Sequence, residues 1–148
     1  MNGLKKYLAT GVLAASMLFA NAAGAMQIPQ FDQMSVNDQD TYITLLAQGA
    51  ANALYAHGDR AGGDKLVQLF DDTSNNNGEH QFWTYLAEVR TMNANNAANS
   101  NNTTPPYEVE NAFELMLNKN GIKVPISVLM AINKDFKPGQ KLPAKTTK

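Results

Sequence analysis

Two histidines, each with a carboxylate beside it, are the residues of this chain best suited to bind a metal. His57 lies two positions before Asp59, and His80 directly follows Glu79. Imidazole nitrogens and carboxylate oxygens are ordinary zinc ligands, and three of them with a water make a catalytic site. If the helices that carry these residues run antiparallel, their ends would bring all four groups together. The sequence therefore allows a small metal-dependent hydrolase using these four residues, although no HExxH motif supports it.

Other signatures of an exported enzyme are missing or have a simpler explanation. His57 ends a predicted helix, where the helix dipole stabilises a charged imidazole without any metal. The loop 72–78 is rich in oxygen side chains, but its glycine and its twelfth position do not fit a calcium loop. Glu79 and Glu88, the leading pair of acids for a glycosidase, lie nine positions apart on one predicted helix, which does not suggest a shared cleft. Without a cysteine or a GxSxG motif, we expect no catalytic residue and no cofactor.

Four side chains form the binding surface that the sequence predicts. Trp83 and Arg90 are residue types that often anchor protein interfaces, and they lie along one side of a predicted helix. Glu110 and Glu114, four positions apart on another predicted helix, would form an acidic recognition edge. Their simpler interpretations are a tryptophan in the core and acids that face solvent.

The stretch from Ser35 to Gly58 is the strongest predicted helix and the centre of the predicted bundle. Ser35 can cap its first turn, Asp38 places negative charge near the positive end of the dipole, and Gly58 supplies a left-handed ending. Gly49 and the alanines around it keep the helix surface thin, so a neighbouring helix can approach closely. Residues at helical spacing give it one apolar face: Val36, Ile43, Leu46, Ala47, Ala50, Ala53, Leu54 and His57.

Two further helices are predicted in the middle of the chain. After a turn over 59–64, Asp64 is expected to cap a short second helix. The third helix is expected to begin with Asn76 and Glu79 spaced as a capping box. The core face of the third helix is expected to consist of Phe82, Leu86 and Val89, with Asn93 as a further candidate.

The last two predicted helices begin at prolines. The fourth is expected to start at 104–106, a Thr-Pro-Pro sequence, and to end at Gly121, with Ile122 folded back as in a Schellman ending. The fifth opens at Pro125 and includes Phe136. No run of alternating β-branched residues occurs, so the sequence predicts an all-α fold, a small bundle of about five helices.

Three segments are expected to lie outside these helices. Residues 26–34 are interpreted as an extended lead-in that lays Ile28 and Phe31 on the bundle. The asparagine-rich stretch 94–104 and the segment 138–148 contain too little apolar bulk to offset the entropy of ordering, so both are predicted to be mobile.

Residues 1–25 have the pattern of a secretory signal peptide. Lys5 and Lys6 form a positive region, an apolar segment follows over 7–19, and Ala23-Gly24-Ala25 offers a small-residue cleavage site. No later stretch matches that length of unbroken hydrophobicity, so no membrane span is expected in the mature protein. The sequence therefore predicts export through a Sec-type signal to the periplasm or the medium.

Composition bounds the rest of the chain. The 148 residues carry a net charge of −1 and are 44% hydrophobic, which suits one helical domain over 26–136. Residues 137–148 form a lysine-rich tail that is expected to be disordered and to attract anionic envelope polymers weakly. Because no cysteine occurs, no disulfide or lipid attachment is expected.

Export, helical packing and the lack of catalytic motifs together favour a binding role. We expect an exported non-catalytic protein that acts as a protein-binding or adaptor module of the bacterial cell envelope, with a protein partner there. No specific nucleic-acid partner is expected. The metal-dependent hydrolase described above is the alternative.

Overall fold

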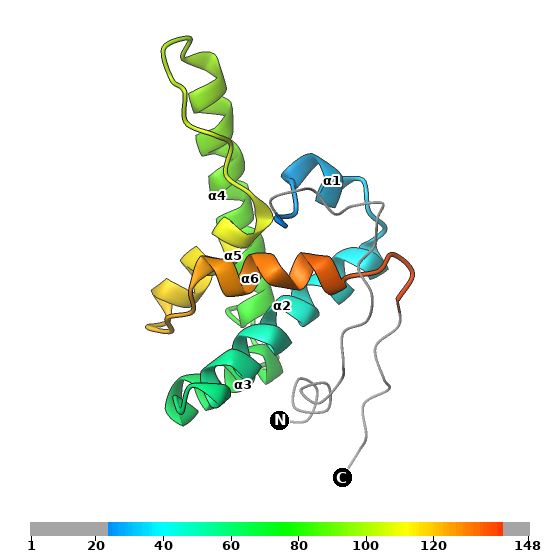
Figure 1. Ribbon diagram of the computed structural model, residues 1–148, viewed down its shortest axis with the longest axis vertical. Coiled ribbons are helices and arrows are strands. Elements are labelled where there is room, and N and C mark those ends of the chain that lie inside the picture. The colour runs from blue at the N-terminus through cyan, green and yellow to red at the C-terminus, as the bar shows by residue number, and fades with distance from the viewer. Residues whose placement is uncertain (1–23, 141–148) are drawn as a thin grey trace.

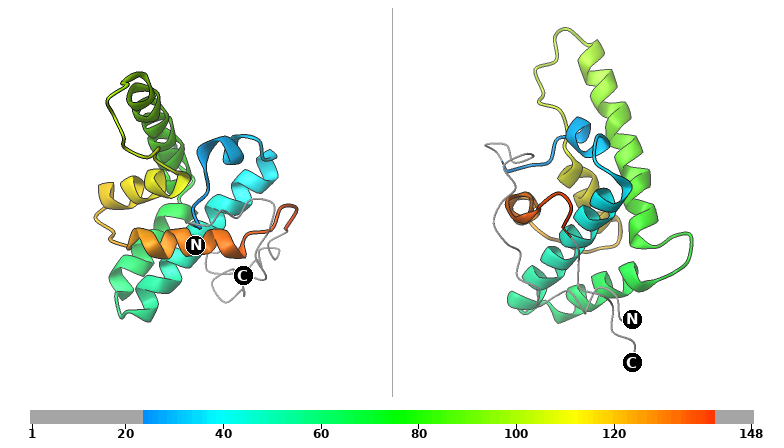
Figure 2. Two further views of the ribbon diagram at one scale, coloured as in Figure 1. Left: turned by 45° about the horizontal axis from the view of Figure 1, so that its top comes forward. Right: turned by 90° about the vertical axis from the view of Figure 1, so that its right-hand side faces the viewer.

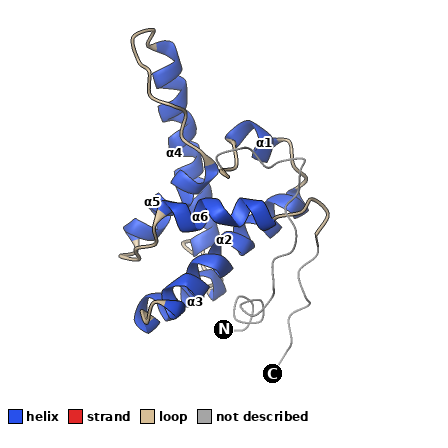
Figure 3. Cartoon of the chain, viewed as in Figure 1, coloured by secondary structure: helices blue, strands red, loops and turns tan. Residues whose placement is uncertain are grey.

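The computed structural model describes residues 24–140, and this part of the chain is helical without any strand (Figure 1; Figure 3). The all-α prediction is therefore confirmed. Most of the predicted signal segment and the end of the predicted tail, residues 1–23 and 141–148, lie outside the described residues. Six α-helices and a final 3-10 turn follow in order: α1 (Ile28–Asp32), α2 (Val36–Ala56), α3 (Arg60–Asp71), α4 (Gly78–Ala98), α5 (Val109–Lys119), α6 (Ile126–Ile132) and η2 (Asn133–Asp135).

The helices pack as two neighbouring pairs with α6 laid across them. The most extensive packing joins α2 to α3 and α4 to α5, while α6 packs on both α2 and α5. Buried apolar side chains from α1 through the segment after η2 meet in one core cluster. The C-terminal half of α4 extends beyond the other helices, and the loop 99–108 returns beside it (Figure 1; Figure 2).

The predicted central helix is present as α2, with the ends that the sequence indicated. The Ser35 hydroxyl oxygen accepts a hydrogen bond from the Asp38 amide at 3.1 Å. At the other end Gly58 has φ +83°, and the Asp59 amide closes back on the Leu54 carbonyl at 2.9 Å. Two members of the predicted apolar face are exposed, however. Val36 is 71% exposed because it lies in the first turn, before α2 reaches the core, and His57 caps the exposed far end.

The thin surface of α2 allows the close approach that the sequence suggested. A Cβ atom added at Gly49 would lie 2.4 Å from Cδ1 of Ile132 in α6, far inside van der Waals contact. The absence of a side chain at Gly49 thus sets how closely α6 lies on α2.

The second helix begins earlier than predicted. Asp59, not Asp64, is the N-cap of α3, and its carboxylate accepts from the Gly62 amide at 2.9 Å. Asp59 directly follows the left-handed Gly58, so α3 begins as soon as α2 has ended. The predicted turn over 59–64 is therefore the first turn of α3. Asp64 instead accepts a hydrogen bond from the Tyr55 hydroxyl at 2.7 Å.

The third helix differs from the prediction at both ends. Asn77 caps α4 by accepting from the His80 amide at 2.8 Å, so the predicted capping box of Asn76 and Glu79 is wrong. The helix also continues to Ala98, through the first residues of the segment predicted to be mobile. Three of the five residues 94–98 are alanine, the best helix former. Adding them to an existing helix is favourable, because the unfavourable formation of its first turn has already taken place. Phe82, Leu86 and Val89 of its predicted core face are fully buried, and the further candidate Asn93 is half-buried.

The fourth helix begins at Val109, after the prolines and not at them. A residue before proline is restricted to extended conformations, which keeps residues 104–106 out of the helix. The Asn93 side chain then holds the chain extended, accepting from the Tyr107 amide at 2.7 Å and donating to its carbonyl at 3.0 Å. The predicted ending is confirmed, because Gly121 has φ +72° and the Ile122 amide donates to the Leu117 carbonyl at 2.9 Å.

The two ends of the described chain are more ordered than the sequence suggested. The predicted extended lead-in contains α1, although Ile28 and Phe31 are buried as expected. The last helix, α6, ends at Ile132, and Phe136 is buried after η2. Beyond it, the Gly139 amide donates to Oδ1 of Asp38 at 2.9 Å, so the beginning of the predicted tail contacts the start of α2.

Candidate functional site

Trp83 and Arg90, the predicted interface anchors, both contact α1. The rings of Phe31 and Trp83 lie 5.6 Å apart, and Trp83 is half-buried. Directly after Phe31, the Asp32 carboxylate forms an ion pair with the exposed Arg90. These two residues therefore fix α1 to one side of α4, and each keeps part of its side chain exposed.

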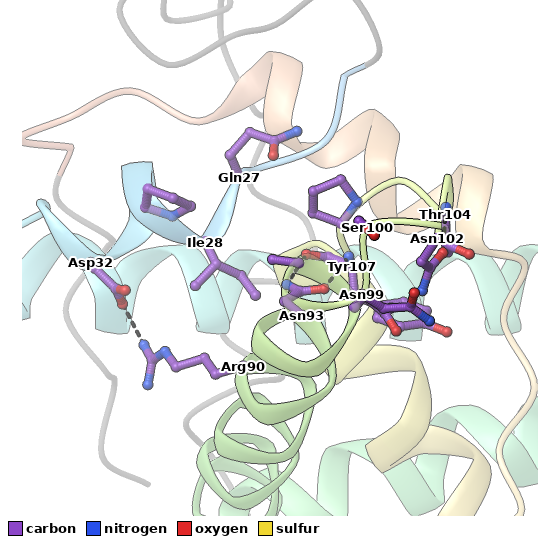
Figure 4. A pocket seen from close by; sticks show the side chains of 14 residues that line it. Gln27, Ile28, Asp32, Arg90, Asn93, Asn99, Ser100, Asn102, Thr104 and Tyr107 are labelled. Carbon is purple, nitrogen blue, oxygen red and sulfur yellow. Dashed lines mark hydrogen bonds and ion pairs between the residues drawn. The ribbon is translucent and has the colours of Figure 1, made fainter.

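A groove opens next to this contact, between α1, the end of α4 and the returning loop. Its volume is about 590 Å³. Figure 4 shows Asp32 and Arg90 at one end and Asn102 and Thr104 at the other. The lining combines amide, hydroxyl and apolar side chains: Gln27, Ile28, Pro29, Asp32, Arg90, Asn93, Asn96, Ala97, Asn99, Ser100, Asn102, Thr104, Pro106 and Tyr107.

The asparagines of the groove divide into two kinds. The side-chain oxygens of Asn99 and Asn102 shape the loop by accepting from the amides of Asn101 at 3.1 Å and Thr104 at 2.7 Å. The Asn96 side chain forms no hydrogen bond within the described part of the chain, and neither do the Nδ2 groups of Asn99 and Asn102. The groove thus presents amide groups that are available to a ligand.

The predicted acidic edge does not exist. Glu110 is only 1% exposed, whereas Glu114 is half-buried. The sequence contained a signal for this difference. Glu110 lies three positions before Phe113 and seven before Leu117, so it belongs to the buried stripe of α5.

Glu110 receives three hydrogen bonds in its buried position. The Met26 amide donates to Oε1 at 3.0 Å and to Oε2 at 3.3 Å, and the Tyr42 hydroxyl donates to Oε2. Burial raises the pKa of Glu110 to about 7, although these hydrogen bonds favour the charged form. Burial and the Glu110 carboxylate also raise the pKa of Tyr42, which keeps its hydroxyl a donor.

The four candidate metal ligands are not brought together. His57 and Asp59 line one cavity of about 310 Å³, whereas His80 lines another of about 340 Å³. Burial, followed by the charge of Asp40, raises the pKa of Glu79, which places Glu79 near Asp40. Asp40 precedes His57 by seventeen positions on α2, or about 25 Å at the usual rise of a helix. Within residues 24–140 no group of three or more His, Cys, Asp or Glu could hold a metal ion.

The oxygen-rich loop before α4 satisfies its own polar groups. The Asp72 carboxylate accepts from the Ser74 amide at 2.8 Å and from the Ser74 hydroxyl at 3.0 Å. These bonds form a turn closed by its own side chains, which supports the interpretation as a polar turn.

No protein family, no curated protein and no solved structure matches this chain. None of the described helices has the length and the hydrophobicity needed to cross a membrane.

Proposed function

We propose that this chain is an exported, non-catalytic binding module of the bacterial cell envelope that holds a segment of a protein partner in the groove beside α1. The groove of about 590 Å³ is the observation that carries the proposal. It is large enough for several residues of a ligand, and its lining combines many amide and hydroxyl groups with the apolar surface of Ile28, Pro29 and Pro106.

The chemistry of the lining favours an extended polypeptide. A peptide main chain offers donors and acceptors in alternation, and a carboxamide side chain can match both. Asn96 and the Nδ2 groups of Asn99 and Asn102 supply such contacts, while Ile28 and Pro106 offer apolar surface to the side chains of the peptide.

The charge of the groove argues against a polyanion such as nucleic acid. Its lining contains one basic and one acidic side chain, Arg90 and Asp32, and these are paired with each other. A ligand rich in phosphate would find no net positive charge there. The lysines of the predicted tail would add only a weak, salt-sensitive attraction to anionic envelope polymers.

Export rests on residues 1–25 of the sequence. The positive residues Lys5 and Lys6, the apolar segment and the Ala23-Gly24-Ala25 site support removal of this leader by a signal peptidase. The product would begin at Met26 and reach the periplasm or the medium.

Site-specific photo-crosslinking in the native envelope tests the proposal. A photoreactive amino acid is placed at Ala97, which lines the groove, or at Asn95, an exposed position on the same part of α4 that does not. Mass spectrometry identifies the crosslinked molecule, and N-terminal sequencing of the purified protein shows whether it begins at Met26.

We expect one protein to crosslink at Ala97 and not at Asn95, with a yield that falls several-fold in Asn96→Ala. Equal crosslinking at both positions, or a glycan as the captured molecule, would contradict a peptide-binding groove. A retained leader would contradict export.

A further inference from the structure

The first residues after the predicted cleavage site are fastened to the start of α5. The Met26 amide donates to both carboxylate oxygens of Glu110, at 3.0 and 3.3 Å, and its carbonyl accepts from the Val109 amide at 3.1 Å. The Gln27 side chain donates to Oε2 of Glu108 at 2.6 Å. Two acids therefore face the point where the mature chain is expected to begin.

The carboxylate of Glu110 has no basic partner in the described part of the chain. From α2 it meets the neutral Tyr42 hydroxyl, and Glu108 adds a second negative charge nearby. The side chain of Lys134, from η2, lies beside Gly24 and forms no ion pair with Glu110. Burying a charged carboxylate without a counter-charge is costly. A positive charge placed beside Glu110 would therefore stabilise its charged form.

Cleavage after Ala25 would create that charge at the right atom. Hydrolysis by a signal peptidase breaks the peptide bond between Ala25 and Met26. The hydroxyl of a water joins the Ala25 carbonyl carbon, and its proton joins the Met26 nitrogen. The resulting α-amine binds a further proton in neutral solution, because its ordinary pKa is about 7.7–8.0. An amide with one donor thus becomes an ammonium group with three donors and a positive charge.

We propose that, in a chain that begins at Met26, the α-ammonium group forms a buried ion pair with Glu110 and so neutralises its buried charge. In the cell this pairing rests on the proposed cleavage after Ala25, but its chemistry can be tested without an export pathway. The nitrogen is already within hydrogen-bond distance of both carboxylate oxygens, so it needs no displacement to form the pair. Cleavage also removes the buried Ala25, which the control described below retains.

The pairing would couple removal of the leader to stability. While Met26 carries an amide, burial raises the pKa of Glu110 to about 7, and the charged carboxylate weakens the fold at neutral pH. An ammonium group at the same position favours the charged carboxylate and reverses the sign of its contribution. The processed chain would therefore be more stable than the unprocessed one.

Defined cuts in vitro test the pairing. Residues 1–25 are replaced by a soluble tag and a protease site that releases the chain either directly before Met26 or, as the matched control, before Gly24. The control differs by two small residues and keeps an amide at Met26. Both are made with Glu110 and with Glu110→Gln. Chemical unfolding is measured at neutral pH, and the pKa of the α-amine is obtained from the pH dependence of its acylation.

In the chain with Glu110, we expect the form that begins at Met26 to have an unfolding equilibrium constant about tenfold smaller than the control, and its α-amine pKa to be about one unit higher. In Glu110→Gln the pKa difference should disappear, and any difference in unfolding that remains there reports the loss of the buried Ala25 alone. Equal unfolding constants together with an ordinary α-amine pKa in the Met26 form would overturn the pairing. An exported protein that begins elsewhere would instead contradict only the cleavage site of the proposed function.

Discussion

Glu110 joins two parts of the chain that lie far apart in sequence. Its carboxylate, in the first turn of α5, accepts hydrogen bonds from Met26, at the start of the predicted mature chain, and from Tyr42 in α2. A buried acid of this kind makes the free energy of unfolding depend on pH. The direction of that dependence shows whether a neutral amide or a charged ammonium group lies next to the carboxylate.

We predict that the chain that keeps an amide at Met26 loses stability as the pH rises from 5 to 8. The folded chain holds the Glu110 proton up to a pKa of about 7, whereas the unfolded carboxyl releases it near 4.5. Its contribution to stability is therefore complete below about pH 4.5 and is lost as the pH rises through 7, a change on the order of 3 kcal/mol. Chemical unfolding at a series of pH values measures it.

Glu110→Gln is the control, because it keeps the shape of the side chain and removes its titration. Burial is also the main cause that raises the pKa values of Asp40, Glu79, Glu108 and Asp135. The contribution of Glu110 is therefore the difference in unfolding free energy between the chain with Glu110 and Glu110→Gln. If this difference does not change between pH 5 and 8, Glu110 does not titrate as the structure indicates.

At the scale of the element, α4 carries both the core and the groove. Its first half buries Phe82 and Leu86, and its second half extends past the core to line the groove. Asn93 lies in the second half, one turn beyond the last buried residue Val89, and its side chain forms two hydrogen bonds with the Tyr107 main chain. This clamp fixes the returning loop, and hence the width of the groove.

Asn93→Ala should destabilise the protein by about 1–2 kcal/mol, because it leaves the partly buried amide and carbonyl of Tyr107 without their partner. Asn95→Ala, on the exposed side of the same helix, should change stability by no more than about 0.5 kcal/mol. Denaturant unfolding measures both. The clamp is unimportant if the two substitutions have equal effects.

At the scale of the molecule, the described chain consists of a packed body and a projection. Every helix contributes buried side chains to one core, but the last turns of α4 and the loop beyond them extend away from it (Figure 2). Main-chain segments with few buried contacts open locally at low cost in free energy.

Within residues 24–140, we expect limited proteolysis to cut first between residues 99 and 104, in the loop, and later at 94–98, where the backbone is hydrogen-bonded in α4. Sequencing the first fragments by mass spectrometry locates the cut. Initial cleavage within 94–98 would mean that the end of α4, which carries the lining residues Asn96 and Ala97, is frayed in solution.

Much of the fold could be predicted where it depends on neighbours in sequence. The cap at Ser35 and the endings at Gly58 and Gly121 were correct, because each requires one residue type within a turn of the helix end. The start of α3 at Asp59 was missed, because two nearby aspartates can both cap a helix and only the contact of Asp64 with Tyr55 distinguishes them.

The candidate site could be predicted only in part. Arg90 lines one end of the groove, whereas Trp83 is not among its lining residues. The sequence could not show that α1 would occupy part of the surface of both. Asn96 was missed because asparagine in a low-complexity stretch has the composition of a mobile loop. The contact of Asn93 with Tyr107 was missed because it joins α4 to a segment fourteen positions later in the chain.

The sequence by itself determined the helical class and those helix ends that one residue type fixes, the Ser35 cap and the endings at Gly58 and Gly121. These follow from the spacing of apolar residues and from local backbone preferences. Tertiary structure decided the environment of Glu110, the formation of the groove and the separation of His57 from His80. These features depend on which helix faces lie against each other. That choice is made by packing between residues distant in the chain, such as Met26 and Glu110, and no local pattern records it.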